Sequence, residues 1–473
     1  MYNSTRLTLT EVFHLSNTNS SRNRAAFSGR IGYVLAAAGS AIGLGNIWRF
    51  PYLAARYGGG MFLLVYIILT VTFGYTLIIA ETSLGRMTKR GPIGAFRRLG
   101  AGRTLMAGGW INAIVPMLIV PYYSVIGGWV LKYLVAYLTQ SAQVISSDDY
   151  FSLFISDSRS VVLYFVIFSA IVFAVILAGV QKGIEQLSKI LMPILLILAV
   201  FVAVYSMTRP GALAGVKYFL IPDFSHFSWM SVVAAMGQMF YSLSIAMGIL
   251  YTYGSYLNRD VDIDKSTGQL EFFDTGVAIL AGLMIIPSVF SFFNGDISKL
   301  HAGPSLTFIT LPQVFVSMKG GTIVAIAFFT MFLLAALTSA ISLMETSINT
   351  LEDELHLSRP KCALVMCLVM GVLGISSSLG YGAWSNVKIL GMAILDFFDF
   401  LTNSIMMPVA ALATFFLVIR KVGLEKIDEE VEASSQNFRR KKLFHFFIKY
   451  LAPAFILLIL ISSILNAFGI ISI

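Results

Sequence analysis

Cysteine and charge are both scarce in this sequence. Its two cysteines, Cys362 and Cys367, lie in one apolar run at a spacing that points them in divergent directions on a helix, so they predict neither a disulfide nor a metal site. Charged residues make up only 12% of the 473 residues, against 57% hydrophobic residues and a mean hydropathy of +0.81. So little charge excludes a soluble enzyme and predicts a membrane protein.

The net charge of +9 does not indicate a nucleic-acid partner, because the basic residues sit in short loops rather than on one continuous face. They indicate topology instead. The loop after the second apolar run is rich in cations and has no acid: Arg86, Lys89, Arg90, Arg97, Arg98 and Arg103. The loop after the third run has Asp148, Asp149 and Asp157 against Arg159. We therefore expect a multi-pass protein of the inner (plasma) membrane with a cytoplasmic N-terminus.

The apolar runs are long enough to cross a bilayer, which takes about 20 residues. Because they show no period-two alternation, they satisfy their backbone hydrogen bonds in lipid only as helices, which predicts an all-α integral membrane protein. The eleven expected spans lie at 31–55, 61–85, 104–138, 160–180, 188–208, 230–257, 272–295, 320–353, 362–380, 388–419 and 446–472. Eleven crossings place the C-terminus on the extracellular or periplasmic side.

The first span is interrupted by small and polar residues. Gly39, Gly43 and Gly45 are closely spaced in its middle, and Asn46 and Arg49 follow directly. If this span were an ordinary packed helix, its arginine would be a charge in lipid, at a cost of about 2.5–3.5 kcal/mol. A helix that breaks at the glycines is the better interpretation.

The sixth span has a similar centre, with Gly237, Gln238, Ser242, Ser244 and Gly248. Interrupted spans at corresponding places in two halves of a chain indicate the binding site of a secondary transporter, where unwound backbone exposes carbonyls to cations and N–H groups to anions. Spans one to five and six to ten are then candidate inverted repeats. The alternative for span six is that its small residues only allow close helix packing.

The chain accordingly divides into five expected regions. They are a flexible cytoplasmic tail at 1–28, two five-helix repeats at 29–210 and 211–420, a cytoplasmic loop at 421–445, and the eleventh span within 446–473. Inside the second repeat, the segment 296–319 is too short and too charged for a span, since it carries Lys299 and Lys319. We expect a short re-entrant or surface helix there, acting as an extracellular lid.

The eighth span carries oxygen atoms on one face. Ala335, Thr338 and Ser339 stand at i, i+3 and i+4, so a carbonyl and two hydroxyls lie together. Neutral oxygen ligands suit a hard monovalent cation such as Na⁺. The alternative is that both hydroxyls bond back to their own helix.

Several motifs of this sequence resemble those of the neurotransmitter:sodium symporter family. They are GSAIGLGNIWRFPY at 39–52, GGGMF at 58–62, the pair Tyr122-Tyr123, GQMFYSLSIAMG at 237–248, ITLPQVF at 309–315, LTSAISLMET at 337–346 and LEDEL at 351–355. The resemblance covers nearly the whole chain. It implies a LeuT-like fold, with a 5+5 inverted repeat plus one extra helix and about eleven transmembrane helices.

The resemblance also implies two sodium sites. The first would use the Ala41 carbonyl with the side chains of Asn46, Ser242 and Asp274, together with the carboxylate of an amino-acid substrate. The second would use carbonyl and hydroxyl oxygens of Gly39, Ile42, Ala335, Thr338 and Ser339, and so contains the oxygen face described above. Acids inside spans are functional candidates in their own right.

The substrate site that the resemblance implies includes Gly43, where monoamine carriers of the family have an aspartate. A zwitterionic amino acid is therefore expected, with its carboxylate at Leu44, Gly45 and Tyr123. The complete expected set is Ala41, Gly43, Leu44, Gly45, Ile119, Tyr123, Tyr241, Ser242, Ser244, Met247, Ser339, Ala340 and Leu343. The small Ala340 and the adaptable Met247 favour a large hydrophobic or aromatic side chain.

Two further implications concern chloride and gating. Chloride-dependent relatives have asparagine at position 274, so Asp274 predicts chloride-independent transport. The outer gate would pair Arg49 with Asp399. The inner gate would pair Arg24 with Asp353, assisted by Phe27, Tyr256 and Glu345.

The expected mechanism is sodium-coupled symport by alternating access, with sodium and an amino acid binding at the two breaks. An amino-acid-binding membrane sensor of the same fold is the alternative, although the chain has gate pairs and no appended signalling domain. An intramembrane enzyme is disfavoured because the sequence has no HExxH or GxSxG motif and no cluster of metal ligands.

Overall fold

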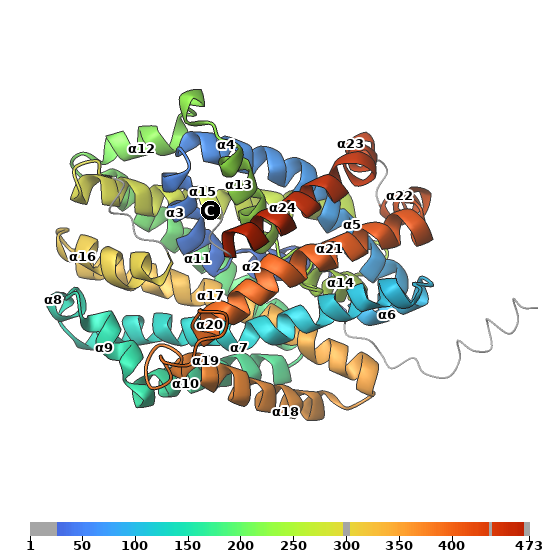
Figure 1. The fold of residues 1–473 in the computed structure, drawn as a ribbon, viewed down its shortest axis with the longest axis horizontal. Coiled ribbons are helices and arrows are strands. Elements are labelled where there is room, and N and C mark those ends of the chain that lie inside the picture. The colour runs from blue at the N-terminus through green and yellow to red at the C-terminus, as the bar shows by residue number, and fades with distance from the viewer. Residues whose placement is uncertain (1–25, 297–302, 435–437, 468–473) are drawn as a thin grey trace, which may run out of the picture.

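The computed structural model describes residues 26–296, 303–434 and 438–467, and the inner-gate residue Arg24 lies outside them. Long helices run roughly parallel along the molecule (Figure 1). The first half contains α2 Arg30–Ala41, η1 Gly45–Arg49, α3 Phe50–Arg56, α4 Gly60–Leu69, η2 Thr70–Gly74, α5 Tyr75–Thr88, α6 Pro92–Arg98, α7 Arg103–Thr139, α8 Ala142–Ile145, α9 Tyr150–Ser156, α10 Ser158–Leu177, η3 Val180–Glu185 and α11 Gln186–Met207.

The second half is also built of helices, more of them short. They are α12 Ala212–Leu220, η4 Phe224–His226, α13 Trp229–Ser242, α14 Ile249–Ser255, α15 Ile263–Phe292, η6 Leu306–Thr310, α16 Leu311–Val316, α17 Gly321–Leu355, α18 Arg359–Val369, η7 Met370–Gly374, α19 Ile375–Leu379, α20 Ile394–Asp399, η8 Phe400–Met406, α21 Met407–Leu417, η9 Val418–Val422, α22 Leu424–Glu432, α23 Lys441–Phe446, η10 Phe447–Leu451 and α24 Ala452–Ala467. Within the described ranges there is no β-strand, and the all-α prediction is confirmed.

Nine continuous helices of the described chain are long and apolar enough to cross a membrane, and the bent pair Arg30–Ala41 and Gly45–Arg56 makes a tenth span. The expected sixth span corresponds to α13 and α14, which are separated by a longer break. This arrangement is compatible with the eleven predicted spans. The expected lid segment contains one short apolar helix, Leu306–Val316.

The seventh span begins earlier than predicted. It was expected at 272–295, but α15 starts at Ile263. Polar residues in its first turns misled the hydropathy pattern, because Asp264 and Glu271 are buried in the protein interior rather than exposed in a loop. The predicted start of the tenth span at 388 is also too early, since a turn with positive φ at Leu390 and Gly391 precedes α20.

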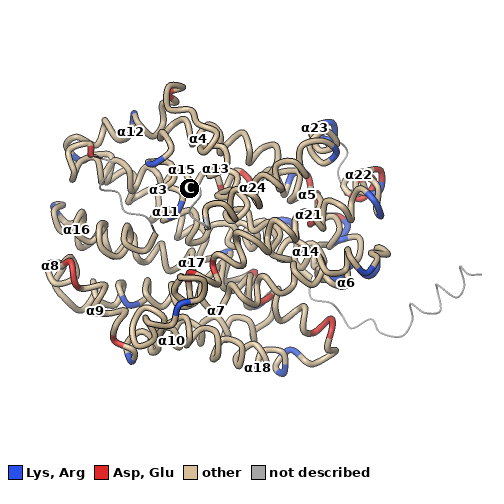
Figure 2. The backbone as a smooth tube through the Cα atoms, viewed as in Figure 1, with Lys and Arg blue, Asp and Glu red and all other residues tan. Residues whose placement is uncertain are grey.

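Basic residues gather at the end of the molecule that holds α6, α22 and α23 (Figure 2). The expected loop at 421–445 is largely helical there, and ion pairs attach it to the bundle. Buried Arg86 on α5 donates to the carboxylate of Glu430 on α22 at 2.6 Å, and Arg440 donates to Glu271 on α15 at 2.9 Å. Two Arg–Glu ion pairs therefore attach this segment to α5 and α15. In one the arginine lies in the span, and in the other it lies in the segment.

Close backbone contact between α5 and α14 depends on two glycines. A Cβ atom on Gly85 would lie 2.2 Å from the Tyr251 carbonyl oxygen, and one on Gly254 would lie 2.4 Å from that of Thr82. Backbone atoms cannot give way as a flexible side chain does. Any side chain at either position would push the two helices apart.

We predict that Gly85→Ala lowers the stability of the purified protein by about 1–3 kcal/mol, because the added methyl group overpacks this contact. Thermal unfolding in detergent measures the change. The matched control is Gly371→Ala, where a Cβ would meet nothing within 4 Å. Equal melting temperatures for the two variants would contradict the role assigned to the glycine contact.

Candidate functional site

The first span breaks where its glycines lie. Helix α2 ends at Ala41, Ile42 leaves the helical conformation with φ −80° and ψ 90°, and the chain resumes as a helix at Gly45. The two halves are bent by 52°. The predicted interruption of this span is confirmed, and it leaves backbone groups of the protein interior outside any regular helix.

The sixth span breaks over a longer stretch. Helix α13 ends at Ser242 and α14 begins at Ile249, and between them Ser244, Ala246 and Gly248 all have positive φ, at 54°, 61° and 69°. The alternative that the small residues of this span only assist packing is therefore wrong. Non-glycine residues in the left-handed region are uncommon and cluster at functional sites.

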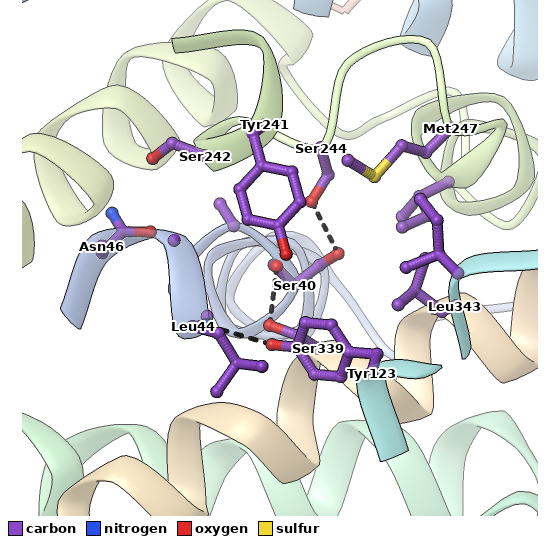
Figure 3. Close-up of a pocket in the computed structure, with 15 residues that line it drawn as sticks. Ser40, Leu44, Asn46, Tyr123, Tyr241, Ser242, Ser244, Met247, Ser339 and Leu343 are labelled. Carbon is purple, nitrogen blue, oxygen red and sulfur yellow. Dashed lines mark hydrogen bonds between the residues drawn. The ribbon is translucent and has the colours of Figure 1, made fainter. Parts of the chain in front are cut away.

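A cavity lies between the two breaks, and the space there that no protein atom fills amounts to about 330 Å³, including the part open to solvent. Figure 3 shows how side chains from both breaks meet helices α7 and α17 around it. The lining residues are Ser40, Ala41, Gly43, Leu44, Gly45, Asn46, Ile119, Tyr123, Tyr241, Ser242, Ser244, Met247, Ile249, Ser339 and Leu343. Of the expected substrate residues, only Ala340 is not among them.

Hydroxyl groups and a glycine, Gly43, line the middle of the cavity. The backbone N–H of Leu44 donates to the Tyr123 hydroxyl at 3.1 Å, and the hydroxyls of Ser40 and Ser244 lie 3.1 Å apart. A Cβ on Gly43 would lie 2.6 Å from the Ser339 hydroxyl oxygen, so this position has no room for a side chain.

The opposite part of the cavity is apolar. Met247 and Leu343 face one another on the side away from Asn46 and Ser242 (Figure 3). Ile119 and Ile249 are further apolar residues of the lining. The cavity can therefore hold a molecule that is polar at one end and apolar at the other.

Three residues of the first expected sodium site, Asn46, Ser242 and Asp274, meet at the fully buried Asp274 carboxylate, and the fourth, Ala41, lines the cavity. One carboxylate oxygen accepts hydrogen bonds from the Asn46 amide at 2.8 Å and the Ser242 hydroxyl at 2.5 Å, and the other accepts from Tyr66 at 2.7 Å. The side-chain oxygen of Asn46 is buried with no hydrogen-bond partner in the described chain. A buried acceptor without a donor beside a carboxylate fits a cation.

The residues of the second expected sodium site also lie together. The Ser339 hydroxyl donates to the Ser40 carbonyl at 2.9 Å, and the carbonyl oxygens of Gly39 and Ile42 lie 3.2 Å and 3.4 Å from it. The Thr338 hydroxyl donates to the Ala335 carbonyl at 3.1 Å. The back-bonding alternative thus describes Thr338, whereas Ser339 reaches across to the first span.

The outer-gate residues Arg49 and Asp399 contact different partners and form no direct ion pair within the described residues. The guanidinium of Arg49 is 5.8 Å from the centre of the Tyr241 ring. Asp399 accepts hydrogen bonds from Asn403 at 2.6 Å and from Tyr122 at 3.3 Å. No Arg49–Asp399 ion pair within 4.0 Å is found in the described parts of the chain.

The inner-gate residues are brought together in part. The Tyr256 hydroxyl donates to Glu345 at 2.7 Å, and the Phe27 ring packs edge-on against Tyr256. Asp353 pairs with Arg90 at 3.2 Å. The sequence did not predict this pair, nor the buried ion pair of Glu345 with Arg359.

Sequence reasoning missed several residues of the site. Ser40 and Ile249 line the cavity, and Tyr66 holds Asp274. Glu81 on α5 accepts the Ala246 N–H within the second break at 3.0 Å. An acid inside a predicted span was a signal that could have identified Glu81. The hydroxyl of Tyr66 gave no such signal.

Comparisons with known proteins identify the family of this chain. The sequence profile of the sodium:neurotransmitter symporter family matches residues 24–149 and 152–470. The chain is 35% identical over 449 residues to the sodium-dependent transporter YhdH of Bacillus subtilis, covering 94% of this chain and 98% of that protein. It is 33% identical over 463 residues to a sodium-dependent transporter of Haemophilus influenzae, covering 94% and 100%.

A solved structure is similar over the same length. The crystal structure of MhsT in complex with L-phenylalanine matches with a TM-score of 0.84 and 34% identity, covering 93% of this chain and 100% of that chain. The predicted LeuT-like fold is therefore confirmed. The chain belongs to the sodium:neurotransmitter symporter family, and it is a multi-pass, sodium-dependent membrane transporter rather than an enzyme.

Proposed function

We propose that this transporter couples the entry of sodium to the uptake of an amino acid with a large hydrophobic or aromatic side chain, independently of chloride. One observation carries the proposal. The cavity between the two breaks is polar at one end and apolar at the other, and residues of both oxygen clusters, at Asp274 and at Ser339, line it.

The cavity suggests how such a substrate would bind. Its carboxylate would accept from the Leu44 N–H and the Tyr123 hydroxyl, which now bond each other. Its side chain would contact Met247 and Leu343 at the apolar end. The L-phenylalanine in the MhsT structure, a protein of 34% identity, supports an aromatic substrate.

Two sodium ions would bind beside the substrate. One would lie at Asn46, Ser242 and Asp274, where the substrate carboxylate completes the ligands, and this shared ligand couples ion to substrate. The other would lie between the end of α2 and α17, at Thr338 and Ser339. Each ion that enters down a potential of about 100 mV releases about 2.3 kcal/mol for accumulation.

Transport would proceed by alternating access in the inner membrane, with the basic end of the molecule in the cytoplasm. The outer gate at Arg49 and Asp399 has no direct ion pair, so few contacts oppose its opening. The inner end is held by Arg359 with Glu345 and by Arg90 with Asp353. These ion pairs would have to separate when the site faces inward.

Uptake of radiolabelled amino acids into proteoliposomes tests the proposal. We expect an inward sodium gradient to drive accumulation of phenylalanine, tyrosine, tryptophan or leucine above equilibrium, with no effect of a potassium gradient of the same size. Binding of these amino acids without sodium-driven accumulation would instead favour the sensor.

The second sodium cluster gives a sharper prediction. Replacing Thr338 and Ser339 together with alanine removes both hydroxyl ligands, so the sodium KM for uptake should rise at least about tenfold, the equivalent of about 1.4 kcal/mol. Ser347→Ala is the matched control, because its hydroxyl is also buried on α17 but bonds back to Leu343 at 2.8 Å. An unchanged sodium KM in the double variant would refute a sodium ion at this cluster.

Chloride independence is tested at Asp274. Uptake by the wild type should not change when chloride is replaced by gluconate, since a buried carboxylate already supplies the negative charge. Asp274→Asn removes that charge, so we expect its uptake to be low in gluconate and at least partly restored by chloride. Loss of wild-type uptake on removal of chloride would contradict the proposal directly.

A further inference from the structure

One face of α15 carries three buried acids. Asp264, Glu271 and Asp274 follow one another at intervals of seven and three residues, which place their side chains on the same side of a helix. Their exposed fractions are 6%, 3% and 0%. Asp274 belongs to the first sodium cluster, but the function proposed so far uses neither of the other two.

A single arginine reaches into this face from the segment before α23. Arg440 donates to Glu271 at 2.9 Å and to the Val71 carbonyl at 3.2 Å, and its guanidinium lies 4.4 Å from the centre of the Tyr75 ring. The Tyr75 hydroxyl in turn donates to Asp264. Glu271, Arg440, Tyr75 and Asp264 therefore form one connected group.

The charges in this group do not balance. The group holds two carboxylates but one guanidinium, which pairs with Glu271, while Asp264 accepts from the Tyr75 hydroxyl and from the backbone N–H of Arg439 at 3.4 Å. One carboxylate oxygen of Glu271 is buried with no hydrogen-bond partner in the part of the chain that the structure describes. An ionised carboxylate in that state is costly, and a proton on the free oxygen would remove the cost.

We propose that Glu271 is a proton-binding site one helical turn from the first sodium cluster, and that its charge sets the affinity of that cluster for sodium. The charged and titratable groups around it are Asp264 and Asp274 on α15, Tyr75 on α5, and Arg440 before α23. The Arg440 side chain is 36% exposed and that of Glu271 only 4%, so water beside the arginine, at the basic end of the molecule, would supply the proton to Glu271.

The coupling is electrostatic and rests on the proposed sodium site. Side chains three residues apart on a helix are about 5–6 Å apart at Cβ, so an ionised Glu271 adds negative charge beside Asp274 and favours a cation there. A proton on Glu271 removes that charge and weakens sodium binding. By linkage, sodium binding must then also favour release of the proton.

The test is the sodium KM for amino-acid uptake as a function of pH. In the wild type we expect the sodium KM to fall several-fold as the pH rises, because Glu271 loses its proton. Glu271→Gln should hold the KM at the wild-type acid value at every pH. Arg440→Gln should move the midpoint of the change to higher pH, since the arginine charge favours the ionised carboxylate.

Glu432→Gln is the matched control, because Glu432 forms a comparable ion pair with Lys441 at 2.9 Å on the surface of the same segment. Its pH response should equal that of the wild type. A purely structural role would lower uptake at all pH values without moving the midpoint. Retention of the wild-type pH response by Glu271→Gln would overturn the proposal.

Infrared difference spectroscopy of the purified protein gives a readout that does not need transport. Lowering the pH should produce the absorption of a protonated carboxyl group in the wild type, and Glu271→Gln should lack it. An infrared band that persists unchanged in Glu271→Gln would overturn the proton site even if sodium-driven uptake is normal. Absence of sodium-driven uptake with the expected infrared change would instead refute the proposed function.

Discussion

The peptide groups of a membrane-spanning segment need hydrogen-bond partners inside the protein, and this requirement governs the whole structure. A helix supplies them along its own length, so a break persists only where neighbouring groups replace them. Here Glu81 bonds the Ala246 N–H and Gln238 donates to the Gly45 carbonyl at 3.0 Å. Ser339 serves the end of α2 in the same way. The breaks are therefore supported by the surrounding helices, and they leave a cavity between them.

Asp274 joins the two broken spans through its hydrogen bonds. Its carboxylate gathers Asn46 from the first break, Ser242 from the second and Tyr66 from α4. A cation at this point would be shared by spans one, six and seven, so its arrival or departure would change the contacts of all three. The contacts of Glu271 and Arg440 extend the same helix face toward the basic end of the molecule.

Sequence reasoning predicted the features that follow from local composition and from motifs. Runs of apolar residues predicted the spans, and closely spaced glycines with Asn46 and Arg49 predicted the first break. Sequence reasoning was wrong or silent where contacts between distant segments determine the structure. The start of α15 was misplaced because its acids are buried, and the pairs Arg359–Glu345 and Arg90–Asp353 join segments whose proximity no local pattern reveals. Tyr66 was missed for the same reason.

An experimental structure with sodium and L-phenylalanine would test the central claim most directly. The account predicts the amino acid between the two breaks, with its carboxylate at the Leu44 N–H and the Tyr123 hydroxyl, and an ion at each of the two oxygen clusters. A bound amino acid elsewhere in the molecule, with nothing between the breaks, would contradict it.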